Sequence, residues 1–156
     1  MADKKDAQKE KKMDVALEMM KFYQEEFMYR HKHYWDLIIK FFSLFVLVTT
    51  LPIISGVLGV ALKEISQKHL VFFPIIGVLI AALGRHVVMM EVKFMASANK
   101  SKYRINQKLI PAEYQYEWFD KTNLNSKKKR FSFQLPNIIF IFELLIAGCV
   151  VLMIYM

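Results

Sequence analysis

Two ionisable residues inside apolar runs are the most informative candidates for chemistry in this chain. Arg85 lies five residues before the end of the apolar run Leu70 to Met90, and Glu143 lies seven residues after Pro136 in a later run. At about 1.5 Å per residue, and if these runs cross a membrane, both lie roughly 8 to 11 Å deep from its cytoplasmic side. Charged side chains in apolar helices face a partner or a water-filled path rather than lipid. We therefore predict that Arg85 and Glu143 form a direct or water-bridged pair, which either fixes helix register or serves an ion pathway.

Catalytic and metal-binding signatures are missing from the sequence. It contains no glycine-rich phosphate loop, no Gly-x-Ser-x-Gly elbow and no His-Glu-x-x-His pair. His31 and His33 are two residues apart, so on a helix they point about 200 degrees away from each other and are poorly placed to share a metal. The single Cys149 lies in an apolar run, which is typical of a packing residue, and it excludes a disulfide within one chain. We predict no catalytic residue, no metal site and no cofactor.

The elements that must position Arg85 and Glu143 are long apolar segments. The chain of 156 residues is 55% hydrophobic and also 23% charged, so the two kinds of residue must be segregated. Three runs, Leu37 to Leu62, Leu70 to Met90 and Ile138 to Tyr155, are each long enough for a helix to cross a bilayer. The predicted fold class is an all-α integral membrane protein with three transmembrane helices and long cytoplasmic helical extensions of the first two.

Positive charges predict the orientation of these spans. Of the 22 Lys and Arg residues, eight precede the first span, two lie in the loop at 63–69 and ten fall between Glu91 and Gln134. Because cytoplasmic segments carry the excess of Lys and Arg, the N-terminus is predicted to be cytoplasmic and the C-terminus external. The net charge of +8 follows the spans in this way, which disfavours a nucleic-acid partner.

Six segments are predicted along the chain. They are a cytoplasmic charged lead and amphipathic helix (1–35), transmembrane helix 1 (36–62), an external loop (63–69), transmembrane helix 2 (70–90), a cytoplasmic stalk with an aromatic short helix and a basic linker (91–135), and transmembrane helix 3 (136–156). The first two spans should be antiparallel neighbours because the loop between them is short. Each should continue without a break into its extension, and Pro52 should kink the first span.

Helical periodicity predicts one apolar stripe on each extension, so that the two extensions pair. On the first helix the stripe consists of Met13, Ala16, Leu17, Met20, Tyr23, Phe27 and Tyr34; on the second it consists of Phe94, Ala98, Ser101, Ile105 and Leu109.

Aromatic and basic residues beside the spans suggest contacts with lipid and with other copies. Tyr34 and Trp35 fit an interfacial aromatic belt, and Lys40 can reach back to the interface. An aromatic helix after Pro111 is predicted to supply oligomer contacts, through Tyr114, Tyr116, Trp118 and Phe119. The densest charge run is predicted to meet anionic lipid headgroups, through Lys127, Lys128, Lys129 and Arg130.

The order of these elements also carries a family resemblance. An amphipathic helix and two spans are followed by a Tyr-x-x-Asn-x-x-Leu stalk, a Pro-x-x-Tyr-x-x-Glu-Trp element and a third span that opens with Leu-Pro. The matching residues are Tyr103, Arg104, Ile105, Asn106, Lys108, Leu109, Pro111, Tyr114, Glu117, Trp118 and 135–140. This pattern resembles the RipA-like family of small bacterial octameric membrane proteins. The resemblance implies a homo-oligomer, an octameric ring, in the bacterial inner membrane, with a cytoplasmic assembly of stalks.

Two functions remain open from the sequence. The first is a homo-oligomeric inner-membrane protein that forms a ring or pore-like complex and permeabilises or conducts across the membrane. The second is a membrane-anchored scaffold that recruits a cytoplasmic protein partner without conduction. A membrane enzyme acting on lipid would have only Glu143 and the histidines to work with, so it is the weakest interpretation.

Overall fold

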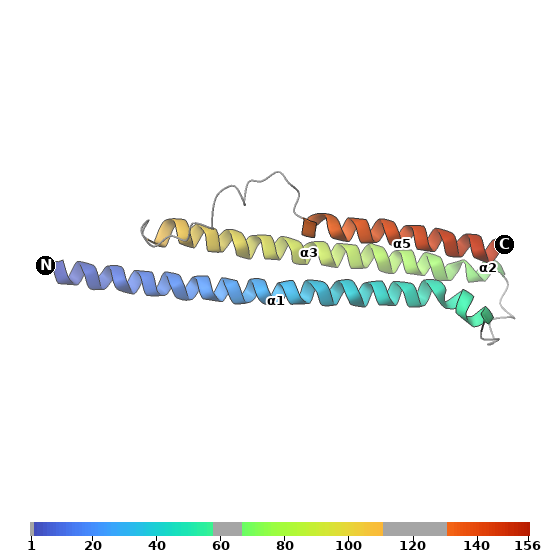
Figure 1. Ribbon diagram of the computed structural model, residues 1–156, viewed down its shortest axis with the longest axis horizontal. Coiled ribbons are helices and arrows are strands. Elements are labelled where there is room, and N and C mark those ends of the chain that lie inside the picture. Colours follow the sequence, from blue (N-terminus) through green and yellow to red (C-terminus); the bar gives the residue numbers. More distant parts are fainter. Residues whose placement is uncertain (1, 58–66, 111–130) are drawn as a thin grey trace. The chain divides into compact units, whose positions relative to one another are not determined.

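The computed structural model describes residues 2–57, 67–110 and 131–156, with side chains placed for 10–54, 69–110 and 134–156. In this part of the chain all regular structure is helical. The elements are α1 (Ala2–Val57), the short α2 (Gln67–Leu70), α3 (Phe72–Leu109) and α5 (Phe131–Tyr155) (Figure 1). The three long helices are each long and apolar enough to cross a membrane.

The predicted continuity of the first two helices is confirmed. Before Pro52, no Gly or Pro interrupts α1, and α3 contains neither after Gly84, so nothing breaks the backbone ladder over these stretches. The third helix begins at Phe131, five residues before the predicted start of the span, and it includes Pro136.

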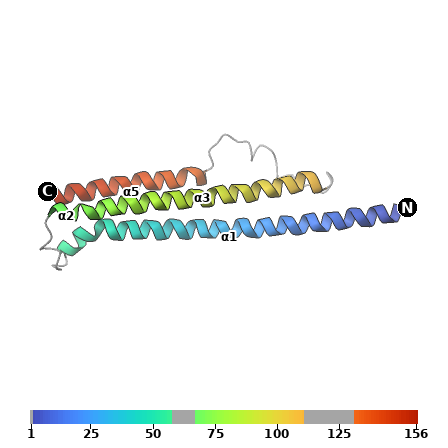
Figure 2. The same ribbon diagram turned by 180° about the vertical axis from the view of Figure 1, so that it is seen from behind.

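The end of α1 bends, as Pro52 predicts. The ring nitrogen of Pro52 has no hydrogen to donate to the carbonyl of Val48. Before Pro52, the Thr50 hydroxyl donates a hydrogen bond of 2.7 Å to the Val46 carbonyl. Figure 2 shows the last turns of α1 leaving the line of the preceding turns. The helix nevertheless continues through Pro52 to Val57.

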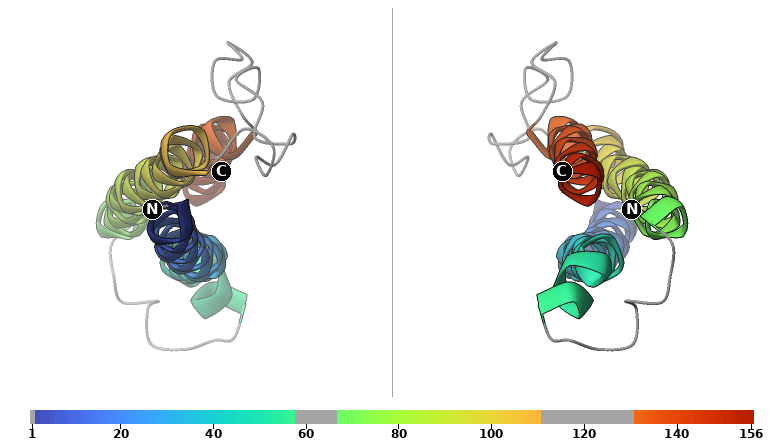
Figure 3. Two further views of the ribbon diagram at one scale, coloured as in Figure 1. Left: turned by 90° about the vertical axis from the view of Figure 1, so that its left-hand side faces the viewer. Right: turned by 90° about the vertical axis from the view of Figure 1, so that its right-hand side faces the viewer.

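The chain divides into two units, each with its own internal packing. The extension unit comprises Met1–His33 and Glu91–Lys129, and the apolar unit comprises Tyr34–Met90 and Arg130–Met156. Within the apolar unit, the end-on views show segments of α1, α3 and α5 side by side (Figure 3). Phe45, Ala81 and Ala147, one from each helix, form the buried cluster between them.

Small residues on α3 allow close packing inside the apolar unit. A Cβ atom added to Gly84 would lie 2.7 Å from the Cβ atom of Phe41, and one added to Gly77 would overlap the hydroxyl of Thr49. Gly77, Ala81 and Gly84 recur at steps of four and three residues, so they share one face of the helix. Small residues at such spacing are the usual way for apolar helices to approach closely.

The extension unit packs along a stripe that differs from the predicted one on α3. Ala98 and Ile105 are buried as predicted, but Phe94 is 44% exposed and Leu109 is 50% exposed. The buried positions instead include a lysine and an asparagine, in the set Val92, Met95, Ala98, Lys102, Ile105 and Asn106. On α1, Ala16 is buried, and Met20 and Tyr23 pack around it against Ile105 and Ile110.

Candidate functional site

One small cavity lies in the apolar unit and brings together the two charged residues singled out from the sequence. All three long helices line it, through Ile38, Phe41, Phe42, Ala81, Gly84, Arg85, Val88, Pro136, Ile139 and Glu143. It has about 20 Å³ open to the centre of a water molecule. A site of roughly 10–15 Å³ on this measure holds one water, so this cavity has the size of one or two water molecules.

Arg85 is held in place by α5. Its Nε donates a hydrogen bond of 2.8 Å to the side-chain oxygen of Asn137, and the guanidinium carbon lies 5.4 Å from the ring centroid of Phe140. Asn137 and Phe140 are three residues apart, so the helix presents both on one side. A cation over an aromatic face is attracted by the ring electrons, which helps to keep the guanidinium beside α5.

Glu143, on α5, lines the same cavity. Glu143 is only 4% exposed, whereas Arg85 is exposed in the single chain. Within the described residues Arg85 and Glu143 form no direct ion pair with each other, and Arg85 donates to Asn137 instead. A water-bridged pair across the cavity stays a prediction.

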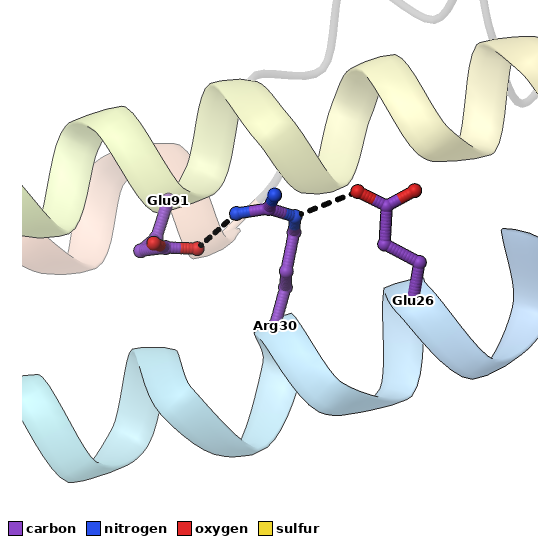
Figure 4. Close-up of polar contacts among 3 residues, drawn as sticks. All are labelled: Glu26, Arg30 and Glu91. Carbon is purple, nitrogen blue, oxygen red and sulfur yellow. Dashed lines mark hydrogen bonds and ion pairs between the residues drawn. The ribbon is translucent and has the colours of Figure 1, made fainter.

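A second charged cluster lies in the extension unit, where α1 meets α3 (Figure 4). Arg30 on α1 donates to Glu26 at 3.0 Å within its own helix and to Glu91 on α3 at 3.2 Å. The ring of Phe94 lies 4.5 Å from the guanidinium carbon. These contacts raise the pKa of Arg30, first through the hydrogen bond that it donates to Glu26 and then through Glu91. Arg30 therefore joins the two helices as a permanently charged clamp.

Lys102 is the buried cation of the extension unit. It is 6% exposed, donates a hydrogen bond to the side-chain oxygen of Gln24, and lies 5.8 Å from the ring centroid of Phe27. Burial lowers the pKa of Lys102 below its ordinary value, because the charged ammonium loses hydration. Polar groups in a helical seam fix which residues face each other, so Arg30 and Lys102 together set the register of α1 against α3.

The other residues singled out from the sequence fall in three places. Tyr34 is buried and packs edge-on against Trp35, with ring centroids 5.4 Å apart, while Trp35 itself is 43% exposed. Lys40 is exposed. The predicted oligomer contacts at 114–119 and the predicted headgroup contacts at 127–130 lie outside the described residues.

Sequence reasoning singled out Arg85 and Glu143, but it missed the charged groups of the extension unit, Arg30 and Lys102, and the partners of both arginines. Glu26 and Arg30 stand four residues apart, a spacing that itself signals an ion pair on a helix. Glu91 and Asn137 gave no comparable signal, because each meets its arginine only through packing between helices distant in sequence.

Neither a metal site nor a known relative identifies a function for these residues. Among the residues whose positions are described, no three His, Cys, Asp or Glu side chains gather where they could hold a metal ion. Comparisons with protein-family models, curated proteins and solved structures found no match. The resemblance to the RipA-like family therefore stays a prediction.

Proposed function

We propose that this chain is a multi-pass integral membrane protein with spans at 36–62, 70–90 and 136–156. The observation that carries the proposal is the exposure of its most apolar segments. The best 18-residue windows of the three helices have mean hydropathies of 2.3, 1.9 and 2.7, yet only 17%, 28% and 17% of their residues are buried within the chain. A soluble three-helix bundle would cover such windows, so lipid or other copies must do so.

The orientation follows from the charges, with the N-terminus and the extension unit in the cytoplasm and the C-terminus outside. The uneven distribution of Lys and Arg supports this arrangement. A reporter that is active only outside the cytoplasm, fused after Met156, should be active. Activity of a cytoplasmic reporter at Met156 and in the 63–69 loop would reverse the orientation.

Copies of the protein associate, in this proposal, into a ring in a bacterial inner membrane and conduct or permeabilise there. Within the described part of one chain, the cavity beside Arg85 and Glu143 is too small for a conducting path, so any path must run between copies. Large apolar side chains outside the spans supply surplus contact surface, since Phe22 is 63% exposed and Tyr29 is 68% exposed. Aromatic side chains of this kind are common anchors of protein interfaces.

A second function rests on the same exposed aromatics. If a soluble protein rather than another copy covers Phe22 and Tyr29 on α1, the chain is a membrane-anchored scaffold that recruits a cytoplasmic partner. This alternative requires no path across the membrane.

Ion flux from sealed vesicles separates the two functions. The purified protein is reconstituted into liposomes that contain anionic lipid. Ion flux is followed as a change in the signal of an entrapped ion-sensitive dye. Conduction predicts flux that rises more steeply than linearly with protein density, because several copies are needed. Protein-free liposomes and liposomes that carry an unrelated three-span protein are the controls. Stable insertion without flux at any density would exclude conduction and leave the scaffold.

A further inference from the structure

The environment of Glu143 raises a question that helix packing alone does not answer. The residue is 4% exposed and lies in an apolar helix, yet its side chain lines a cavity with room for water. Burying a charged carboxylate in such surroundings is strongly unfavourable unless a partner compensates its charge.

The groups that face Glu143 supply little compensation for a full negative charge. From α1, the cavity is lined by the apolar side chains of Ile38, Phe41 and Phe42. From α3, the titratable group in the cavity wall is Arg85, and its Nε is committed to Asn137 rather than to the carboxylate. On α5 itself, the other lining residues are Pro136 and Ile139. A bound proton removes the charge and with it the cost of burial.

We infer that this cavity is a proton-binding site, in which Glu143 exchanges a proton with water in the cavity and Arg85 lines the same space as a fixed positive charge. Other small ligands fit the cavity poorly. A metal cation would find one carboxylate and a repelling guanidinium, while the side-chain oxygen of Asn137 already accepts from Arg85. An anion would be repelled by an ionised Glu143. The inference rests on the proposed membrane spans but not on conduction or on the number of copies.

A hydrophobic carbodiimide tests whether Glu143 carries a proton. In this reaction the carboxylic acid adds across one C=N bond of dicyclohexylcarbodiimide: its proton goes to one nitrogen and its oxygen bonds to the central carbon. The acyl group then moves from oxygen to nitrogen and gives a stable N-acylurea, with no leaving group and no change in oxidation state. The reagent partitions into apolar surroundings and requires the protonated acid, so Glu143 should be labelled ahead of Glu26 and Glu91, which are ion-paired with Arg30.

The experiment uses the intact protein in liposomes, with labelled peptides located by mass spectrometry. Labelling of Glu143 should fall as the pH is raised, and Glu143→Gln should abolish it. Arg85→Gln should preserve labelling to higher pH, because loss of the positive charge makes the proton harder to remove. Lys93→Gln, which removes an exposed cation on the same helix, is the matched control and should leave the pH profile unchanged.

A second measurement does not depend on entry of the reagent. The infrared carbonyl band of a protonated carboxylic acid should be present in the wild type at neutral pH and absent in Glu143→Gln. An unlabelled Glu143 together with no such band would overturn the inference, as would a pH profile that Arg85→Gln leaves unchanged. Oligomer size and ion flux, measured on the same samples, report the proposed function separately, so failure of one is distinguishable from failure of the other.

Discussion

A glycine-to-alanine substitution at position 84 should destabilise the protein, because the added methyl group has no space. The new Cβ atom would lie 2.7 Å from both Cβ and Cγ of Phe41 and 3.0 Å from Cδ1. Cβ and Cγ are at the base of the side chain, so Phe41 cannot turn away without a shift of its helix. Overpacking of this kind costs about 1–3 kcal/mol.

Position 148 provides the matched control for this substitution. Nothing lies within 4 Å of a Cβ atom added to Gly148, which is in α5. The change Gly148→Ala should therefore be neutral or stabilising by up to about 1 kcal/mol, the usual gain of Ala over Gly inside a helix. Since this gain applies to both sites, the two variants should differ in stability by the overpacking cost, about 1–3 kcal/mol.

The assay is unfolding of the purified protein in mixed micelles, followed by circular dichroism as the fraction of denaturing detergent is raised. Gly84→Ala should unfold at a lower fraction than the wild type, and Gly148→Ala at the same or a higher one. A related pair tests the same face: Thr49→Ala should relieve part of the loss caused by Gly77→Ala, because it removes the hydroxyl that the new methyl would overlap. Equal losses at positions 84 and 148 would refute the close packing of α1 against α3.

Three further predictions concern the extension unit and the oligomer. Arg30→Met should lower the free energy of unfolding by about 1–2 kcal/mol, because it leaves Glu91, whose side chain is 14% exposed, without its ion-pair partner. In the same unfolding assay Glu91→Gln should destabilise the protein more than Glu26→Gln. The reverse order would contradict the role of Arg30 in joining α1 to α3. Burial lowers the pKa of Lys102 in the folded protein below 10.5, so between that pKa and 10.5 the unfolded chain binds more protons than the folded one. The free energy of unfolding should therefore rise with pH over this range. Lys102→Met should remove the rise, and a rise that persists in this variant would contradict the assignment to Lys102. Trp118→Ala should shift the complex to smaller species on size exclusion, because large aromatic side chains commonly anchor contacts between copies, and an unchanged elution volume would count against this role.

The helices themselves were predictable from the sequence because their determinants are local. The absence of Gly and Pro between Met13 and Pro52 and again after Gly84 is sufficient to predict long continuous helices. The same local reasoning located the apolar windows and the bend at Pro52.

The seam between α1 and α3 was harder to predict, for a physical reason. Lys102 and Asn106 are polar residues at buried positions, so a search for apolar periodicity passes over them and selects the exposed Phe94 and Leu109 instead. Such polar groups are stabilised only by partners on the facing helix, which the spacing along one helix does not reveal.

The contacts around the cavity were also only partly predictable from the sequence. Depth along the helices suggested a pair between Arg85 and Glu143; both line one cavity, and their pairing stays a prediction. The choice of Asn137 as the hydrogen-bond acceptor depends on the rotation of α5 against α3, which sequence spacing does not fix.

The central claim, a membrane protein built from several copies of this chain, is tested most directly by the mass of the particle in detergent micelles. Native mass spectrometry, after removal of detergent in the gas phase, should give a multiple of the 18.4 kDa chain, with eight copies if the resemblance to the RipA-like family holds. Particle images from the same preparation should show the corresponding cyclic symmetry. A fully helical particle of a single 18.4 kDa chain, at every protein concentration tested, would contradict the account.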